Sequence, residues 1–379
     1  MEFSGKTIII LSQQDWGKMF ISKHHYALAL SRMGNDVYYI NGPNRTEEYK
    51  SGEVRIAETN FPNLYSVTHK LYYPLIIKHK AEWLHKMLLK KHISNILNAI
   101  GKKVDLVWSF DISNTMALSA FPEDTLKIYM PVDNPTTKSG IKAADTADLI
   151  LSVTNEILEQ YSQYNTKRVF LNHGVLSDFI SDDSVINESH NIKVGLSGNF
   201  LRKDIDWHTL TDIITSHKDI EFNFWGAIDA RNANLADDFK PNPAIEKVMA
   251  MDNVVIHGAV DPFTLAHELK KMDMFLICYD INKDHSKGTN YHKVLEYLAT
   301  GKVVVSNNIT TYSELPGLVE MPVERNNTKL PELFSKVLSQ LQAYNSNEKR
   351  EYRIAYARSH TYQSNINKVA QLLTSAQAS

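Results

Sequence analysis

Short apolar runs rich in β-branched residues alternate with helical patterns along most of this 379-residue chain. That alternation is typical of parallel sheets joined by crossover helices, so it restricts the chain to an α/β architecture. In the first half the predicted strands are residues 7–11, 37–40, 104–110, 126–130, 148–153 and 168–171. In the second half they are residues 192–196, 221–225, 254–257, 274–278 and 303–306.

Helical patterns fill the intervals between these strands. The first runs over 22–33, with Ser22 as its N-cap and Gly34 beyond its end, and completes a βαβ unit. Later helices are predicted at about 206–217, 262–271 and 291–300, and residues 327–375 are mostly helical. We therefore predict two Rossmann-like domains with a cleft between them and a helical C-terminal segment. The predicted boundaries are 1–176 for the N-terminal domain, 177–191 for a polar linker, 192–350 for the C-terminal domain and 351–379 for a helix that packs back on the N-terminal domain.

Charge and cysteine content exclude several classes of protein. The formal net charge of −2 argues against a protein that binds nucleic acid. Cys278 is the single cysteine and lies in the apolar run MFLICY, so no intramolecular disulfide can form and a reducing compartment is expected. No apolar run reaches the roughly 18 residues of a membrane span, and the first is too short for a signal peptide. We predict a cytoplasmic protein.

The stretch SKGTNYHKVLEYLATGKVVVS at 286–306 combines a polar loop, a helix and a buried strand. Backbone N–H groups at a helix start bind anions, so we expect residues 288–290, with Asn290 as N-cap, to hold a phosphate beside Lys287. Glu296 lies further along the same helix and can face a bound ligand. An ordinary loop and helix of an α/β protein is the alternative explanation of this pattern.

Two common nucleotide-binding signatures are absent. The predicted first strand of each half is followed by SQQDWGKMF or SGNFLRKD, so neither carries G-x-G-x-x-G, and no G-x-x-x-x-G-K-[ST] is present. A dinucleotide-dependent oxidoreductase is therefore disfavoured.

Seven segments resemble, in order and spacing, the family 4 type glycosyltransferases of GT-B fold (glycosyl transferases group 1). They are WSFD at 108–111, YMPVDN at 129–134, ADLILSVTNEI at 147–157, LNHGV at 171–175, VGLSGN at 194–199, NVVIHGAV at 253–260, and YHKVLEYLATGKVVVS at 291–306. The last resembles the family's P-x-K-x-x-E-Y-L-A-x-G-K-P-V-V stretch. The resemblance implies a nucleotide-sugar donor on the C-terminal domain and a glycan or lipid-linked acceptor on the N-terminal domain. It implies hexosyl transfer to an acceptor hydroxyl with retention, typically in surface-polysaccharide biosynthesis. We predict no cofactor and no bound metal, because cationic side chains and the helix dipole can stabilise the diphosphate and no acidic pair at metal-site spacing stands out.

The same resemblance assigns residues to the donor. Glu296 matches the glutamate that binds the ribose hydroxyls, with a helix-surface glutamate as the alternative. Arg202 and Lys203 match basic residues at the donor diphosphate, with a solvated pair as the alternative. The other donor-binding candidates are Gly17, Asn199, Phe200, His257, Gly258, Val260, Gly288, Thr289, Asn290 and Tyr291.

The catalytic candidates are Asp111, Asp133, Arg202 and Lys287. Asp111 and Asp133 follow predicted strands of the N-terminal domain, where either can orient the acceptor hydroxyl or stabilise positive charge at the anomeric carbon. An Asx-turn is the alternative for Asp133. Asp15 and Trp16 are acceptor-binding candidates on the loop after the first strand, where Trp16 either stacks on a sugar or covers the edge of the core.

One position departs from the family. Members often carry E-x7-E, but Gly288 stands eight residues before Glu296. The chain therefore lacks a carboxylate that would contact the donor sugar. Two alternatives follow, a nucleotide-sugar 2-epimerase of the same architecture and a degenerate sugar-nucleotide-binding scaffold protein.

Residues 70–103 hold eight lysines and one acidic residue, with apolar residues at roughly helical spacing. An apolar face packed on the sheet explains that spacing. The alternative is a helix that lies on an anionic bilayer surface, which would place the protein at the inner face of the membrane as a peripheral protein.

Overall fold

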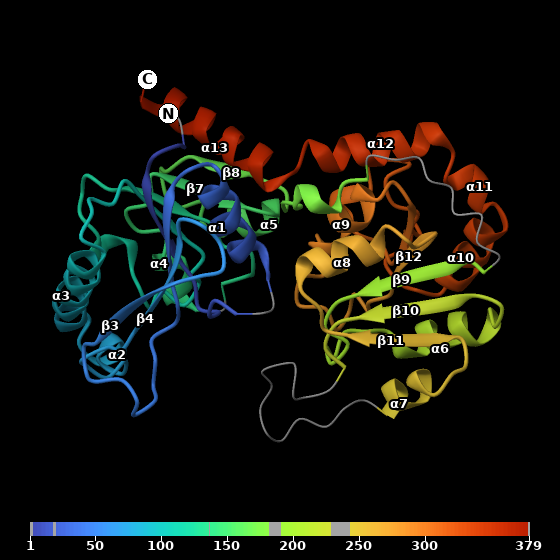
Figure 1. Cartoon of the computed structure of the whole chain (residues 1–379), viewed down its shortest axis with the longest axis horizontal. Coiled ribbons are helices and arrows are strands. Elements are labelled where there is room, and N and C mark those ends of the chain that lie inside the picture. The colour runs from blue at the N-terminus through green and yellow to red at the C-terminus, as the bar shows by residue number, and fades with distance from the viewer. Residues whose placement is uncertain (1–2, 18–19, 136, 182–190, 229–242, 378–379) are drawn as a thin grey trace. The chain divides into compact units, whose positions relative to one another are not determined.

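The computed structural model describes residues 3–17, 20–135, 137–181, 191–228 and 243–377. The chain divides into two compact units (Figure 1). Unit 1 consists of Met1–Asn172 with Tyr362–Ser379, and unit 2 of His173–Thr361. Most of the predicted linker at 177–191 lies outside the described residues.

Unit 1 is built on a sheet whose described strands follow the order β3-β4-β2-β1-β5-β6-β7-β8. Neighbours are parallel except for the antiparallel pair β3–β4. The strands are β1 Thr7–Leu11, β2 Asp36–Ile40, β3 Val54–Glu58, β4 Leu64–His69, β5 Leu106–Ser109, β6 Leu126–Tyr129, β7 Leu149–Ser152 and β8 Arg168–Phe170. All six predicted strands are present, and all but β8 are apolar runs that the sheet buries; β8, at the sheet edge, stays largely exposed. β3 and β4 were not predicted, since both carry polar residues that stay partly exposed at the sheet edge.

The helices of unit 1 are α1 Ser22–Arg32, α2 Ile77–Lys80, α3 Glu82–Ile100, α4 Lys138–Lys142, α5 Asn155–Glu159 and α13 Tyr362–Gln377. The sequence predicted Ser22 as the N-cap of α1, but Ser22 is the first residue of the helix itself. The N-cap is Ile21, whose backbone N–H donates to Nδ1 of His24 at 3.2 Å. α13 packs on α1, where the rings of Tyr362 and His25 stack with centroids 5.1 Å apart.

Unit 2 contains a parallel sheet with its described strands in the order β11-β10-β9-β12-β13. These strands are β9 Lys193–Ser197, β10 Glu221–Trp225, β11 Val254–Gly258, β12 Met274–Ile277 and β13 Val303–Ser306. The helices are α6 Trp207–Ser216, α7 Pro243–Met249, α8 Pro262–Leu269, α9 Lys293–Ala299, α10 Leu330–Ser339, α11 Leu341–Tyr344 and α12 Asn347–Arg358. The five predicted strands are confirmed, and the sheet core contains Cys278, which is buried as expected.

The helix that follows the polar loop of 286–292 begins later than predicted. α9 starts at Lys293, its N-cap is His292, and that residue makes no side-chain capping bond. The prediction that Asn290 caps the helix is therefore wrong. At the other end Gly301, with φ of +78°, ends the helix as expected, and its carbonyl accepts a hydrogen bond from Nη1 of the buried Arg353 on α12 at 3.1 Å.

No helix among the described residues is both long enough and apolar enough to cross a bilayer.

Candidate functional site

The carboxyl ends of β9 to β13 meet at one edge of the unit 2 sheet, because all five strands are parallel. In open α/β sheets this edge is where ligands bind. The loop after β9 supplies Arg202, the segment after β12 supplies Tyr279, and α9 supplies Lys293. These three residues form the centre of the candidate site.

Lys293 is held at the end of β9 by its neighbours. Its Nζ donates to the carbonyl of Ser197 and to the phenolic oxygen of Tyr279, the latter at 2.6 Å. The helix is attached to the same point, since the hydroxyl of Tyr297 accepts from the backbone N–H of Ser197 at 2.6 Å. Lys293 therefore has a fixed position at the sheet edge rather than a free side chain.

Arg202 and Lys293 both lie against the ring of Tyr279. The guanidinium carbon of Arg202 is 5.1 Å and Nζ of Lys293 is 5.0 Å from the ring centroid, so the two cationic centres are at most about 10 Å apart. Such spacing suits a diphosphate, whose charge is spread over two phosphorus centres. Lys293 was not predicted as a site residue from the sequence. The motif could have indicated it, because Lys293 occupies the lysine position of the P-x-K-x-x-E stretch.

Carboxylates balance the charge of Arg202. Its Nε donates to Oδ1 of Asp204 at 2.8 Å, its Nη2 donates to Oδ2 of the same carboxylate, and Nη2 lies 3.5 Å from Oδ1 of Asp284. These contacts, led by the hydrogen bonds to Asp204, raise the pKa of Arg202. Lys293 forms no ion pair with a carboxylate within the described residues, so it is the cation better able to bind an anion.

Asp284 organises the turn that carries several predicted donor-binding residues. Its side chain is 1% exposed and accepts hydrogen bonds from the backbone N–H of Gly288 at 2.9 Å and from the Tyr291 hydroxyl at 2.8 Å. Burial acts to raise the pKa of Asp284, but hydrogen bonds from Ser286, Tyr291 and Gly288 outweigh it, and the net shift is downward. Lys287 is exposed on this turn, whereas Asn290 and Tyr291 are buried.

Gly288 occupies a position that rejects a side chain. Its φ is +67°, and a Cβ there would lie 2.9 Å from the carbonyl oxygen of Asn308. The backbone of the neighbouring Thr289 is also fixed, since the Thr289 carbonyl accepts a hydrogen bond from the Thr311 hydroxyl at 2.6 Å. The glutamate expected from the family at this position could not be accommodated without moving the backbone.

Glu296 lies one turn after Lys293 on α9 and is buried. Burial raises the pKa of Glu296 to about 7, against the opposing effect of the Lys293 charge. Its Oε1 is 3.3 Å from Nδ1 of His292, and burial lowers the pKa of that imidazole to about 4. Glu296 thus lies on the same helix as Lys293, the lysine at the centre of the candidate site.

The predicted nucleobase loop lies at the same sheet edge. The exposed His257 stacks on Trp225 with centroids 4.5 Å apart and an interplanar angle of 6°, and its Nε2 is 2.8 Å from Oδ1 of Asn223. Gly258 accepts a hydrogen bond from Gly226 at 2.8 Å, and no atom lies within 4 Å of the position its Cβ would take. Val260 is half-buried. His257 is therefore the exposed ring of this loop, with unobstructed space beside Gly258.

Three further donor candidates lie after β9 and have different surroundings. The side chain of Asn199 stabilises its own loop, since its Oδ1 accepts a hydrogen bond from the backbone N–H of Leu201 at 3.0 Å. Phe200 is buried against Phe224, with ring centroids 5.0 Å apart. Lys203 is exposed. Of the three, only Lys203 presents an exposed charge.

Asp111 has a clear structural role in unit 1. The carboxylate is buried and accepts hydrogen bonds from Gln13 and from the backbone N–H groups of Ser113, Thr115 and Met116, the last three at 3.0, 2.7 and 2.8 Å. It therefore fixes the loop after β5. Asp133, the other carboxylate candidate, is exposed after β6.

The predicted site residues on the loop after β1 differ in how far they are buried. The Trp16 ring packs against Phe20 and Tyr39 at centroid distances of 4.9 and 5.2 Å, which favours the role of covering the core. Asp15 is exposed and accepts from the backbone N–H of Gly42 at 3.2 Å. Gly17 is exposed, with its Cβ position nearly open.

Lys23 is a buried lysine in the first turn of α1 that the sequence did not single out. Its Nζ donates to Oε1 of Gln14. Burial lowers the pKa of Lys23 to about 8, although the charges of Asp133 and Asp111 act in the opposite direction. The carboxyl edge of the unit 1 sheet thus combines one buried cation with two carboxylates, a grouping that only the fold brings together.

Comparisons with known proteins identify the fold. No family model and no curated protein matches this chain. Sucrose-phosphate synthase from Thermosynechococcus elongatus matches with a TM-score of 0.69 at 12% identity, over 98% of this chain and 99% of that one. The α,α-trehalose 6-phosphate synthase from Burkholderia multivorans gives 0.67 at 11% identity, over 99% and 98%. Anabaena Alr3699/HepE in complex with UDP and glucose gives 0.64 at 12% identity, over 97% and 99%. The chain therefore has the GT-B fold, and the fold class predicted from the sequence is confirmed.

Proposed function

We propose that this GT-B chain is a nucleotide-sugar-dependent glycosyltransferase that moves a sugar from a UDP-sugar to an acceptor hydroxyl. The observation that carries the proposal is the pair of cations, Lys293 and Arg202, held against Tyr279 at the carboxyl edge of the unit 2 sheet. The choice of UDP is supported by solved structures of the same fold that contain it, those of Anabaena HepE and of a trehalose-6-phosphate enzyme with UDP-2-fluoro glucose.

In this proposal unit 2 binds the donor. Lys293 contacts the diphosphate, and Arg202, positioned by Asp204, adds a second contact. Glu296 in its ionised form accepts hydrogen bonds from the ribose hydroxyls, and His257 provides a ring on which the base stacks. When the bond between the anomeric carbon and the diphosphate oxygen breaks, negative charge grows on UDP, and a fixed cation there stabilises the transition state more than the ground state.

Unit 1 is proposed to bind the acceptor, a glycan or a lipid-linked glycan. The acceptor oxygen forms the new bond to the anomeric carbon, with retention, and its proton passes to the departing phosphate. Asp133 is exposed beside the buried Lys23 and is the better placed of the two carboxylate candidates to orient the acceptor, because the Asp111 carboxylate is occupied by its own loop. No step in this scheme uses a metal ion.

We extend the proposal to a peripheral contact with an anionic bilayer, as expected of an enzyme that uses a lipid-linked acceptor in surface-polysaccharide assembly. Trp83 and Met87 on α3 are 72% and 55% exposed, and Ile76 just before α2 is 55% exposed. We call these three residues the α3 ridge. Five lysines lie close to these residues in the sequence, namely Lys78, Lys80, Lys86, Lys90 and Lys91. An exposed Trp among lysines suits the interface of an anionic membrane.

The test is 31P NMR of the full chain with a panel of UDP-sugars, with GDP-, ADP- and CMP-sugars as controls. A glycosyltransferase slowly releases UDP from its own donor even in water, and Lys293→Met abolishes that release. Appearance of a different UDP-sugar would instead assign a 2-epimerase. Tight binding without any turnover, with or without acceptor extracts, would assign the scaffold protein.

A further inference from the structure

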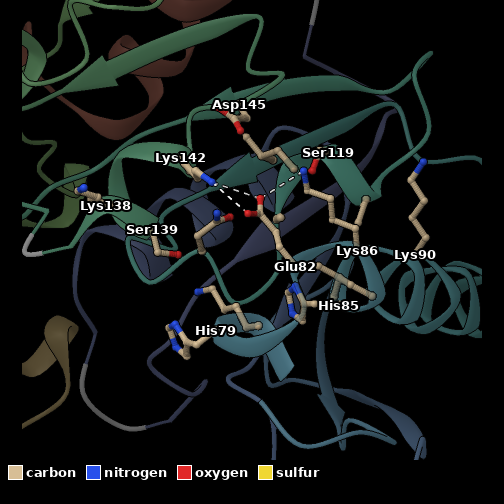
Figure 2. A pocket seen from close by; sticks show the side chains of 16 residues that line it. His79, Glu82, His85, Lys86, Lys90, Ser119, Lys138, Ser139, Lys142 and Asp145 are labelled. Carbon is tan, nitrogen blue, oxygen red and sulfur yellow. Dashed lines mark hydrogen bonds and ion pairs between the residues drawn. The ribbon is translucent and has the colours of Figure 1, made fainter. Parts of the chain in front are cut away.

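A cavity of about 430 Å³ lies in unit 1, and three of the lysines near the α3 ridge, Lys78, Lys86 and Lys90, line it. It is bordered by α2 and α3 on one side and by the loop of 114–120 and α4 on the other (Figure 2). Its charged lining residues are Lys78, Lys86, Lys90, Lys138 and Lys142 with Glu82 and Asp145. Five lysines and two carboxylates give a formal charge of +3 with the histidines neutral. We call this cavity the basic pocket.

Glu82 occupies the centre of the basic pocket and holds two of these lysines. Its carboxylate is 3.3 Å from Nζ of Lys86 and 3.2 Å from Nζ of Lys142, and Figure 2 shows it between the two ammonium groups. Lys90 and Lys138 form no ion pair or hydrogen bond through their ammonium groups within the described part of the chain. The pocket therefore keeps two uncompensated cations on opposite bordering elements, α3 and α4.

Neutral polar groups complete the lining. Ser119 and Ser139 are lining residues with hydroxyl groups, and that of Ser139 donates to the carbonyl of Ser113 at 3.4 Å. His85 is 4% exposed, and its Nε2 has no hydrogen-bond partner among the described residues. The loop opposite α3 is fixed, since the Asp111 carboxylate accepts from the backbone N–H groups of Thr115 and Met116. The preceding Ser113 is held as well, because its N–H donates to Asp111 and its carbonyl accepts from Nζ of Lys78. A fixed wall, the Ser119 hydroxyl and cations without carboxylate partners suit a multiply charged anion.

We propose that the basic pocket binds a phosphate or diphosphate group of the acceptor. The inference rests on the proposed function, because only an acceptor needs a second phosphate site on the unit that does not bind the donor. Lys90 and Lys138 contact the phosphate oxygens directly, and Lys86 and Lys142 exchange part of their contact with Glu82 for contact with the ligand.

Two sources of this group fit the same chemistry. A soluble sugar phosphate would enter the pocket from water. A lipid-linked diphosphate would enter from the bilayer, and Trp83 and Met87 of the α3 ridge stand on the helix face next to Lys86 and Lys90, which would place the pocket at headgroup level.

The test is calorimetric titration of inorganic pyrophosphate into the full chain at low salt in the presence of saturating UDP, which fills the proposed donor site, with UDP titrated separately. The pocket variant is Lys90→Gln with Lys138→Gln. Its matched control is Lys50→Gln with Lys167→Gln, which removes the same two charges from exposed positions of unit 1 outside the pocket. Glucose 6-phosphate and citronellyl diphosphate then serve as the soluble and lipid-like ligands.

We expect pyrophosphate to bind the parent, and its affinity to fall roughly tenfold or more in the pocket variant but by less than about twofold in the control. UDP affinity stays the same in all three proteins. Preference for glucose 6-phosphate assigns a soluble acceptor, and preference for citronellyl diphosphate a lipid-linked one. The proposal is overturned if the parent binds UDP but not pyrophosphate, or if both variants lose the same affinity. Absence of UDP binding would instead contradict the proposed function.

Discussion

Nζ of Lys293 lies 2.6 Å from the phenolic oxygen of Tyr279 and 5.0 Å from the centre of the same ring. The lysine is also bound to the carbonyl of Ser197 at the end of β9. Because both partners belong to the sheet edge, the ammonium group is positioned before any ligand arrives. Such preorganisation lowers the entropy cost of holding a charged side chain against a diphosphate.

Replacing Lys293 with methionine should therefore weaken binding of the diphosphate and leave the nucleoside unaffected. We expect the affinity for UDP to fall by about 1.5–3 kcal/mol, the scale of a hydrogen bond to a charged group, with no change for uridine. Calorimetry of both ligands measures the difference. Lys218→Met is the matched control, since Lys218 is an exposed lysine of unit 2 outside the candidate site. Equal loss of UDP and uridine affinity would mean that Lys293 supports the fold rather than the phosphates.

Gly288→Ala should be more destabilising than Gly258→Ala. Both glycines have positive φ, +67° and +71°, so both substitutions incur backbone strain of about 1 kcal/mol or more. Only at Gly288 would the new Cβ meet a backbone atom, the carbonyl oxygen of Asn308 at 2.9 Å. Urea unfolding followed by circular dichroism gives the two free energies of unfolding. If they are the same, steric exclusion does not explain the glycine at this position.

A buried pair of histidines should make unit 1 sensitive to acid. Nδ1 of His69 is 2.8 Å from Nε2 of His92, and Nε2 of His69 is 3.1 Å from the carbonyl of Asn41. A carbonyl only accepts, so His69 donates from Nε2 and accepts at Nδ1 from His92. A second proton on His69 would break this chain, and one on His92 would have to go to its buried Nδ1, which has no hydrogen-bond partner among the described residues. Burial lowers the pKa of His69 to about 3 and that of His92 to about 4.

The unfolded chain takes up protons below its histidine pKa of about 6.5, while these two rings stay neutral in the folded state. The contribution of these two rings to the free energy of unfolding should therefore be constant above about pH 6.5 and fall by about 1.4 kcal/mol per pH unit for each ring as the pH drops toward 4. His92→Gln, which keeps an N–H donor that does not titrate, should remove one ring's share of this slope. Urea unfolding at pH 5, 6 and 7 measures it, with the exposed His208→Gln as control. An unchanged slope in His92→Gln would contradict the assignment.

The α3 ridge should bind membranes. We expect the full chain to co-sediment with vesicles of 7:3 phosphatidylcholine and phosphatidylglycerol, and Trp83→Ser with Met87→Ser to lose most of this binding. Val323→Ser, at an apolar residue of unit 2 that is 91% exposed, controls for the loss of apolar surface. Binding should weaken with added salt, since lysines supply part of it. No sedimentation of the parent, or equal loss in both variants, would contradict the membrane contact.

The sequence was sufficient for most of the fold because its strands are apolar runs buried in two sheets. It was insufficient for β3 and β4, whose polar residues belong to a half-exposed edge. The start of α9 was placed too early because Asn290 is a good N-cap by residue type, whereas its backbone belongs to the turn that Asp284 organises.

The candidate site was harder to predict than the fold. Glu296 and Arg202 could be proposed from their matches to a family, and both lie in the region of Lys293. Lys23 and the basic pocket could not be foreseen, because contacts between residues distant in sequence create them. The role of Asp111 was equally hidden, since it depends on three backbone N–H groups that point at its carboxylate.

The most direct test of the account is calorimetric titration of UDP into the parent chain and into Glu296→Ala at pH 8, where a group with a pKa of about 7 is ionised. The account predicts that UDP binds the parent and that the variant loses about 1–3 kcal/mol, the cost of leaving the ribose hydroxyls without their partner. It also predicts that the affinity of the parent rises between pH 6 and pH 8, because the carboxylate form accepts from the diol. A folded parent that binds no nucleotide, or a variant that binds UDP as tightly as the parent, would contradict it.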